Sequence, residues 1–390
     1  MQIENALLNA GAKICYSDAR QLPKALELFH PTVQAGVPKV YEIVQTALLK
    51  KLNKGPPAAK LIFDVLFAWK STVLSFGMDT PLTNALFFKL LSKKVFGGTL
   101  QFAVSGGGPL NPNLHNFVRV CFCCPLIQGY ALTETCVGGC FQDTRDSRGN
   151  VVGPPVPCVE IMLQSEPDFK DTAGLPYLHT DTVSNKGEPV IGRGEICMRG
   201  PCISSGYYKL PEKTKEEYDE DGWFHTGDIG QFTADGVIQI VDRKKNIVKL
   251  KGGEYVAVEN MQSSFAESPF VKQICIFADG DLDRPLAVVN ADDDYLKTWA
   301  SEQEMEYESL QDLAEKDETR KACVSSMVKF GKDAGLTSLE VGIKDCCIVT
   351  GTEWGPGHGM TASMKLDRAA ISKMYDDRIN AMYKRNGVNK

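Results

Sequence analysis

The 390-residue sequence has no excess of basic side chains, because its 43 lysines and arginines stand against 49 aspartates and glutamates and leave a net charge of −6. Proteins that bind nucleic acid usually carry a basic surface, so nucleic acid is not expected as a partner. A Walker A phosphate loop is also missing, since no glycine-rich turn is followed by Gly-Lys-Ser or Gly-Lys-Thr. A hydrophobic share of 43% and a charged share of 24% exclude a disordered or fibrous chain.

No run of residues is apolar for the length of a membrane span. The most apolar stretch, residues 61–76, contains Asp64 and Lys70 and is shorter than the about 20 residues that a spanning helix needs. We therefore expect no transmembrane segment and interpret this stretch as an amphipathic helix. A helix of this kind leaves a peripheral contact with a membrane open.

The cysteines follow no regular framework. There are 13 of them, an odd number, and Cys121, Cys123 and Cys124 lie in an apolar run where thiols behave as small hydrophobic side chains. Free thiols favour an intracellular, reducing compartment, with peripheral attachment to the endoplasmic reticulum or another organelle membrane left open. Cys136 and Cys140 are only four positions apart, which could suggest a metal site. No second Cys or His pair follows at zinc-site spacing, so no metal is expected there.

The length predicts two unequal domains, because a single hydrophobic core stops growing at roughly 250–300 residues. A short polar segment, Asp242–Lys245, separates two apolar stretches that read as strands, residues 237–241 and 247–250. A polar joint between strands can act as a hinge. We therefore predict domains at residues 1–241 and 242–390, with the hinge at Asp242.

The order of the predicted elements favours an α/β fold. Residues 99–104 and 125–128 read as buried strands, and a helix is expected near residues 113–120. Strand, glycine turn, helix and strand are typical of an α/β sheet with ligand-binding loops at the strand ends. Between residues 150 and 240, short β runs separated by glycine and proline predict a β-rich region.

The loops after the two strands carry the first candidate residues. Ser105–Pro109 contains three consecutive glycines, which let the backbone approach a flat ring or a phosphate but also suit a tight turn. After the second strand, Tyr130 offers a stacking face, Thr133 a hydroxyl for a phosphate oxygen and Glu134 an oxygen ligand for Mg²⁺. The alternative is a threonine that caps a helix beside an exposed glutamate.

A third candidate lies in residues 223–230. Asp228 stands in a glycine turn after Thr226 and His225, where its carboxylate could accept hydrogen bonds from two adjacent ribose hydroxyls. A β-turn without a ligand is the alternative, and a purely structural role for His225 stays open.

These motifs together resemble the long-chain acyl-CoA synthetases of the adenylate-forming superfamily. The resemblance rests on Asp-Gly-Trp-Phe-His-Thr-Gly-Asp at residues 221–228 and on further motifs at residues 31–33, 37–38, 105–109, 128–135, 242–250, 253–256 and 360–365. It implies an α/β fold in which a large adenylation domain, with mixed sheets and a β-rich subdomain, precedes a small α+β C-terminal lid.

The resemblance also implies a reaction. A long-chain fatty acid carboxylate would attack the α-phosphate of Mg²⁺-bound ATP to give an acyl-adenylate and pyrophosphate. The thiol of coenzyme A would then form the acyl-CoA and expel AMP. Positioning and charge stabilisation dominate phosphoryl transfer of this kind.

Each implied role falls on a residue of the matching motif. Nucleotide contacts would come from Gly106, Gly107, Gly108, Pro109, Gln128, Gly129 and the stacking Tyr130. Thr133 would contact the α-phosphate, Glu134 would hold Mg²⁺, and Asp228 and Arg243 would hold the ribose. Lys365 would bridge the fatty acid carboxylate and the nucleotide, as a long mobile point charge can. Gly253 and Glu254 would line the coenzyme A channel after the lid turns about Asp242.

The sequence departs from the family's pattern in one main respect. The family's Ser/Thr/Gly-rich phosphate loop, which ends in lysine, should precede the segment that resembles residues 1–40, and these 390 residues contain no such loop. We therefore expect residues 1–241 to be the later portion of the adenylation domain and the chain alone to be inactive. A smaller departure is Ala362-Ser363, where long-chain members often carry Pro-Thr. A non-catalytic remnant that binds a nucleotide or acyl-CoA is the alternative.

Overall fold

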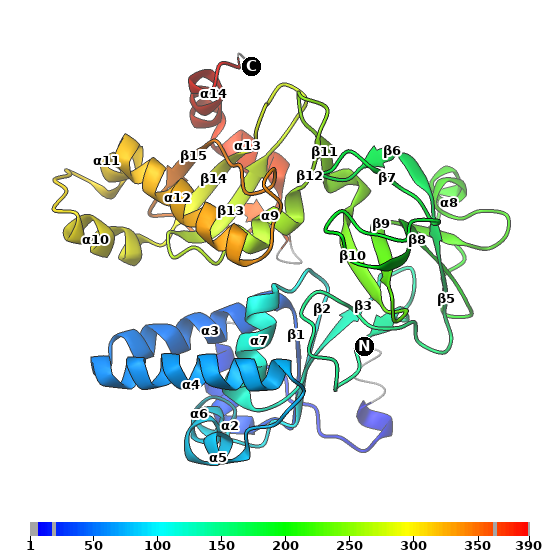
Figure 1. The fold of residues 1–390 in the computed structure, drawn as a ribbon, viewed down its shortest axis with the longest axis horizontal. Helices are drawn as coiled ribbons and strands as arrows, with labels where there is room; N and C mark the ends of the chain where they lie inside the picture. The colour runs from blue at the N-terminus through cyan, green and yellow to red at the C-terminus, as the bar shows by residue number, and fades with distance from the viewer. Residues whose placement is uncertain (1–6, 18–20, 362–364, 389–390) are drawn as a thin grey trace.

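The computed structural model of the protein describes residues 7–17, 21–361 and 365–388 (Figure 1). They form a helix-rich part with a four-stranded sheet, a β-rich part, and a C-terminal part in which helices flank a three-stranded sheet. In Figure 1 the helix-rich part lies at the bottom, the β-rich part at the right and the C-terminal part at the top. The mixed α/β fold expected from the sequence is confirmed.

The first sheet has the strand order β1-β2-β3-β4. Strands β1 (Val33–Gly36), β2 (Phe102–Gly106) and β3 (Leu126–Tyr130) run parallel, and β4 (Cys140–Phe141) pairs antiparallel with β3. Parallel strands end at the same edge of a sheet. The loops that follow β2 and β3 therefore start next to each other.

Helices cover one face of this sheet. They are α2 (Leu22–Phe29), α3 (Pro38–Asn53), α4 (Pro57–Ser75), α5 (Pro81–Thr83), the π-helical turn η2 (Asn84–Phe88), α6 (Lys89–Phe96) and α7 (Pro112–Phe122). Ala103 and Leu126 are buried in the same apolar core as these helices. Phe102, Val104 and Ile127 point to the opposite face and are partly exposed.

Local sequence explains where α7 begins and why α4 tolerates a buried charge. The Asn111 side chain accepts a 2.8 Å hydrogen bond from the Asn113 N–H, and Pro112 occupies the first helical position. The buried Lys70 ammonium of α4 donates to the Val120 carbonyl at 2.6 Å. Residues 61–75 thus fall in a helix, nearly as expected, and among the described residues none of the helices combines the length and apolar character that a bilayer crossing requires.

The β-rich part contains a four-stranded antiparallel sheet of order β10-β9-β8-β5. Its elements are β5 (Glu160–Gln164), β6 (Glu166–Lys170), β7 (Pro176–Tyr177), β8 (Val190–Arg199), α8 (Pro211–Glu217), β9 (Phe224–Thr233) and β10 (Ile238–Arg243), with β6 and β7 forming a separate pair. The buried Arg193 guanidinium joins the sheet to the preceding segment, because it forms ion pairs with Asp171 at 2.6 Å and Asp181 at 2.7 Å.

The C-terminal part is built around the sheet β13-β14-β15. It comprises η3 (Lys244–Asn246), β11 (Ile247–Lys249), β12 (Tyr255–Ala257), α9 (Val258–Phe265), β13 (Val271–Phe277), β14 (Leu286–Ala291), α10 (Asp293–Glu302), α11 (Leu310–Glu315), α12 (Asp317–Asp333), β15 (Asp345–Val349), β16 (Gly355–Pro356), β17 (Gly359–Met360), α13 (Arg368–Met374) and α14 (Asp376–Arg385). Alternate residues of the sheet belong to two apolar cores, one shared with α9 and α12 and one shared with α13 and α14. The central strand β14 is therefore buried along its whole length.

Polar contacts join the C-terminal part to the helix-rich part below it (Figure 1). Asn113 of α7 donates to the Glu267 carboxylate at 2.8 Å, and Lys50 of α3 lies 3.3 Å from the Asp292 carboxylate. These contacts fix one orientation of the C-terminal part. They involve side chains on helix surfaces, which can separate without breaking either apolar core.

Strand β10 continues through the residue predicted as the hinge. After a bulge between Ile240 and Asp242, Asp242 pairs with Ile229 and Arg243 pairs with Asp228 across β9. The strand predicted to end at residue 241 is two residues longer, because strand pairing extends to Arg243 and the irregular turn begins at Lys244. The division into two domains at residue 242 stays a prediction.

Candidate functional site

The two loops singled out in the sequence lie next to each other at the carboxyl edge of the first sheet. Across β2 and β3, Ser105 pairs with Gln128 and Gly106 with Gly129. The loop that follows Gly106 is exposed at Gly107, Gly108 and Pro109. Gly107 has a φ of 81°, a conformation that residues with a Cβ rarely adopt. The sheet edge thus presents bare backbone beside the loop after Tyr130.

Tyr130 meets the predicted ribose-binding residues. Its hydroxyl donates a 2.6 Å hydrogen bond to Asp228 Oδ2, and Arg243 Nε lies 3.3 Å from Asp228 Oδ1. The strand register explains the second contact, since Arg243 of β10 pairs with Asp228 of β9. Three residues predicted from separate motifs therefore form one polar cluster.

Burial shapes the electrostatics of this cluster. Asp228 is only 4% exposed, and burial raises its pKa, while the hydrogen bond from Tyr130 and the charge of Arg243 act in the opposite direction. Burial and the adjacent Asp228 carboxylate hold the pKa of Tyr130 well above its usual value, so the tyrosine keeps its proton and remains the donor. An ionised carboxylate offers about four acceptor positions, so Tyr130 and Arg243 do not saturate it.

Thr133 and Glu134 lie in a turn that follows β3 and does not continue into a helix. The alternative reading of Thr133 as a helix cap is therefore wrong, and its side chain is exposed at the sheet edge. Glu134 is half-buried, and its Oε1 accepts a 2.8 Å hydrogen bond from the Tyr207 hydroxyl. This contact orients the carboxylate, as a residue that holds a divalent cation requires.

Gln128 and Gly129 have structural roles that the motif alone does not reveal. The buried Gln128 amide donates to the Gly149 carbonyl at 2.9 Å and to the Val151 carbonyl at 3.1 Å. A Cβ at position 129 would lie 3.0 Å from the ring of Phe141. The Gln128 backbone is also engaged, because its N–H donates to Gln142 Oε1 at 3.1 Å and its carbonyl accepts from the Gln142 N–H at 2.9 Å.

The predicted pivot residue, Asp242, connects two parts of the molecule. Its Oδ1 accepts from the Arg243 N–H at 2.7 Å, and its Oδ2 accepts from the Glu259 N–H at 3.0 Å, in the first turn of α9. The carboxylate thus satisfies a free backbone donor at a helix N-terminus. Burial and the nearby Glu259 charge raise the pKa of Asp242 to about 7.

Lys244, which follows the pivot, forms ion pairs with two carboxylates of the β-rich part. Its Nζ lies 2.7 Å from Glu166 and 3.0 Å from Glu195. The other oxygen of Glu195 accepts from the Gly227 N–H at 2.9 Å. Burial alone would raise the pKa of Glu195, but the bond and charge of Lys244 outweigh it and lower that pKa.

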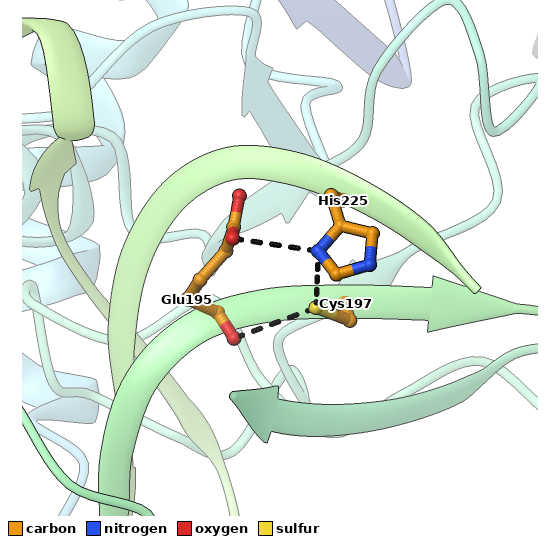
Figure 2. A group of neighbouring side chains, drawn as sticks. All are labelled: Glu195, Cys197 and His225. Atoms are coloured by element: carbon orange, nitrogen blue, oxygen red, sulfur yellow. Dashed lines mark hydrogen bonds and ion pairs between the residues drawn. The ribbon is translucent and has the colours of Figure 1, made fainter. Parts of the chain in front are cut away.

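Figure 2 shows Glu195, Cys197 and His225, whose ligand atoms all lie within 4.8 Å of one another. His225 Nδ1 is 3.5 Å from Glu195 Oε2 and 3.5 Å from Cys197 Sγ. Burial and the Glu195 charge raise the pKa of the Cys197 thiol to about 12, whereas a metal ligand must be a thiolate. The Glu195 carboxylate is also already paired with the Lys244 ammonium. The cluster therefore favours a structural role for His225 over a metal site.

Gly253 and Glu254 form the tip of the hairpin between β11 and β12. Gly253 has a φ of 90°, and the Leu250 N–H donates to the Glu254 carbonyl at 2.7 Å. The adjacent Tyr255 hydroxyl donates to the Asp168 carbonyl at 3.1 Å, so the hairpin packs against β6. The structure does not bring this hairpin to the edge of the first sheet.

The Lys365 side chain is exposed. The backbone N–H of Lys365 donates to Thr361 Oγ1 at 3.2 Å. The Thr361 N–H donates in return to the Lys365 carbonyl at 2.8 Å. Among the described residues, no contact joins Lys365 to Tyr130 or Asp228. Residues 362–364 of the same motif lie outside the described residues.

Sequence reasoning missed Tyr207, Glu195 and the pairing of Lys244. Tyr207 is 73 positions from Glu134, and no local pattern links them. Glu195 did leave a signal, since it is a charged residue inside the apolar strand β8 and is 3% exposed. A buried charge requires a partner, which Lys244 supplies.

Comparisons with known proteins give the family of the chain. Residues 1–208 match the family described as AMP-binding enzyme. The chain is 33% identical over 378 residues to "Fatty acyl-CoA synthetase B" of Dictyostelium discoideum, covering 96% of this chain and 54% of that protein. It is 34% identical to "Long chain acyl-CoA synthetase 4" of Arabidopsis thaliana, covering 98% of this chain and 56% of that protein. The chain thus spans about half the length of these curated relatives.

Solved structures of adenylation domains resemble the fold of this chain. The A domain of the carboxylic acid reductase from Segniliparus rugosus, in complex with AMP and a co-purified carboxylic acid, matches with a TM-score of 0.68 and 26% identity. The match covers 95% of this chain and 50% of that one. The adenylation domain of a carboxylate reductase from Mycobacterium chelonae matches with a TM-score of 0.66 and 25% identity over 95% of this chain.

Proposed function

Because the chain belongs to the AMP-binding enzyme family, we propose that it is part of a long-chain fatty acyl-CoA synthetase, which activates a fatty acid through an acyl-adenylate. The observation that supports this most is the contact of Tyr130 with Asp228 and Arg243 beside the exposed backbone of Gly107 and Gly108. An aromatic ring, a carboxylate and bare backbone together suit a nucleoside. The names of the relatives supply the acyl substrate class.

The nucleotide would lie along the carboxyl edge of the first sheet. Gly106–Pro109 would line the adenine, and Tyr130 would stack on it. Asp228 and Arg243 would hold the ribose. Since Asp228 is 4% exposed, ribose binding requires a shift of the side chains around it. Thr133, which is exposed at the same edge, would donate to the α-phosphate.

Charge on the phosphates requires compensation. The half-buried Glu134, oriented by Tyr207, fits a Mg²⁺ ligand, and Mg²⁺ would neutralise phosphate charge when bound. Lys365 would approach the fatty acid carboxylate and the α-phosphate during adenylation. The Gly253–Glu254 hairpin would reach coenzyme A only after a lid rotation about Asp242, because in the structure it packs against β6.

We further propose that the 390 residues alone turn over slowly or not at all. They contain no glycine-rich loop ending in lysine, so the β- and γ-phosphates would lack a backbone cradle and the departing pyrophosphate would lack charge stabilisation. Contact with a membrane is a separate matter that does not depend on this chemistry.

Two measurements on the purified chain test the proposal. Isothermal titration calorimetry should detect AMP binding, and an ATP-dependent palmitoyl-CoA assay should give little product. Absence of AMP binding by a folded chain would contradict the assignment of the sheet edge. Rapid formation of palmitoyl-CoA would contradict the slow-turnover proposal and leave the nucleotide assignment intact.

A further inference from the structure

The helix layer of the first sheet presents many large apolar side chains to solvent. They come from α4, the segment after it, α5, η2 and α6, and they are Leu61, Ile62, Val65, Trp69, Phe76, Met78, Leu82, Leu86 and Leu90. Val65 is 60% exposed and Leu86 is 75% exposed. We call these nine residues the outer helical face. Soluble proteins rarely expose so many large apolar side chains in one region.

The outer helical face spans elements that are neighbours in space. The rings of Phe63 in α4 and Phe87 in η2 lie 6.4 Å apart, so the two elements pack side by side. Figure 1 shows α5 and α6 directly beneath α4 at the bottom of the molecule, on the side of the helices away from the C-terminal part. The face therefore lies at the periphery of the protein.

The charge of this region is opposite to that of the whole protein. Residues 50–96 contain eight lysines, two aspartates and neither arginine nor glutamate, a net charge of +6, whereas the chain carries −6. Six of the lysines are exposed, namely Lys50, which is paired with Asp292, and Lys51, Lys54, Lys89, Lys93 and Lys94. One of the two aspartates, Asp64, is already paired with Lys60 at 2.9 Å. An apolar face flanked by lysines complements an anionic interface.

The layer order of the fold argues against a further protein layer on the outer helical face. Parallel sheets are normally covered on both faces. The other face of this sheet carries Phe102, Val104 and Ile127, which are partly exposed, and it lies on the side away from the helices. Additional α/β layers would therefore be expected on that face rather than outside α4 and η2.

We propose that the outer helical face binds peripherally to a membrane surface that contains anionic lipid. The apolar side chains would enter the boundary between headgroups and acyl chains, and Trp69, which is 48% exposed, would lie at the headgroup level. The exposed lysines would contact anionic headgroups. The contact needs no spanning helix, in agreement with the helices found among the described residues.

Vesicle co-sedimentation of the full 390-residue chain tests the proposal. The chain should bind phosphatidylcholine vesicles that contain phosphatidylserine, bind pure phosphatidylcholine vesicles less, and lose the difference at high salt because surface charges are screened. Trp69 fluorescence should shift to shorter wavelength with the anionic vesicles. That shift should disappear in Trp69→Phe, since the other tryptophans lie elsewhere.

Matched variants separate this face from the rest of the surface. Val65→Ser with Leu86→Ser should weaken vesicle binding at least tenfold, whereas Ile191→Ser with Leu210→Ser, which are 60% and 54% exposed on the β-rich part, should not. Lys93→Glu with Lys94→Glu should also weaken binding by roughly tenfold or more, given the contribution of each basic residue near an anionic surface. The control is Lys321→Glu with Lys332→Glu on α12.

Two results would overturn the proposal. One is vesicle binding that the control variants reduce as much as the face variants. The other is a lack of binding to anionic vesicles, together with self-association that light scattering detects and that Val65→Ser with Leu86→Ser abolishes. That second result would assign the outer helical face to a second copy of the chain. Because every substituted side chain is exposed, circular dichroism should show an unchanged fold.

Discussion

The Tyr130 hydroxyl donates a 2.6 Å hydrogen bond to Asp228 Oδ2 and so joins two residues that are 98 positions apart. Tyr130 is the last residue of β3, and Asp228 lies in β9 of the other sheet. The bond therefore connects the helix-rich part to the β-rich part at the point where a nucleoside would lie.

Asp228→Ala should weaken AMP binding about tenfold or more, because hydrogen bonds to a charged group contribute about 1.5–3 kcal/mol each. Tyr130→Phe should cost less, since it keeps the stacking ring and removes only the hydroxyl. Calorimetric titration of the chain with AMP measures both. Asp235→Ala, an exposed aspartate beside the same sheet, is the control. An unchanged affinity in Asp228→Ala would exclude the ribose role.

Glu134→Gln should reduce the affinity for Mg²⁺-ATP but leave the affinity for AMP measured without Mg²⁺ nearly unchanged. The amide keeps the shape of the side chain and can still contact the Tyr207 hydroxyl, which lies 2.8 Å from Glu134. It lacks the negative oxygen that Mg²⁺ prefers. Titrations with and without Mg²⁺ separate the two effects. An equal loss in both titrations would indicate a structural role for Glu134.

Sequence patterns predicted those elements whose signals are local. Helix α7 was expected near residues 113–120, after the first glycine turn, and β3 was expected because an apolar run ends in a second glycine turn. Strand β1, Val-Gln-Ala-Gly, was not among the predicted strands. Its four residues carry little strand propensity, and the pairing with β2, more than 60 positions away, makes it a strand.

In the candidate site, too, local motifs predicted single residues, whereas contacts between distant residues could not be predicted. Motifs predicted Tyr130, Asp228 and Arg243 one by one, but only the strand register shows that they meet. Tyr207 carries no motif and comes into contact with Glu134 through tertiary folding alone. The burial of Asp242 was equally hidden, because a polar segment between two strands is normally a solvated loop.

Arg193→Ala should destabilise the protein by about 3–5 kcal/mol, the usual effect of removing one partner from a buried ion pair. It would leave the buried carboxylate of Asp171 without its 2.6 Å partner and the partly exposed carboxylate of Asp181 without its 2.7 Å partner. Arg199→Ala, which breaks an exposed pair with Glu160, should cost about 0–1 kcal/mol. Urea unfolding followed by circular dichroism measures both. A loss in Arg193→Ala no larger than in Arg199→Ala would contradict the argument.

The stability difference between wild type and Asp242→Asn should depend on pH. In the folded protein the pKa of Asp242 is raised to about 7 from its ordinary value of 3.8. The folded state therefore binds this proton more tightly than the unfolded state, and the resulting stability is fully present below pH 3.8 and is lost as pH rises through about 7. The amide introduced by Asp242→Asn does not titrate, so the variant escapes this loss.

At pH 5 the variant should be less stable than wild type. A single amide oxygen accepts from only one of the two N–H groups that Asp242 now serves, those of Arg243 and Glu259. Between pH 5 and pH 8 the wild type should lose unfolding free energy on the order of a few kcal/mol relative to the variant. At pH 8 the stability difference between the two proteins should therefore be smaller or of opposite sign. Thermal unfolding at a series of pH values measures the trend. Asp235→Asn is the control, because the pKa of Asp235 is lowered to about 2 and its titration is complete below this range. A difference between wild type and Asp242→Asn that stays constant from pH 5 to pH 8 would show that the carboxylate is already ionised at pH 5 and that water or a rearranged Glu259 reaches it.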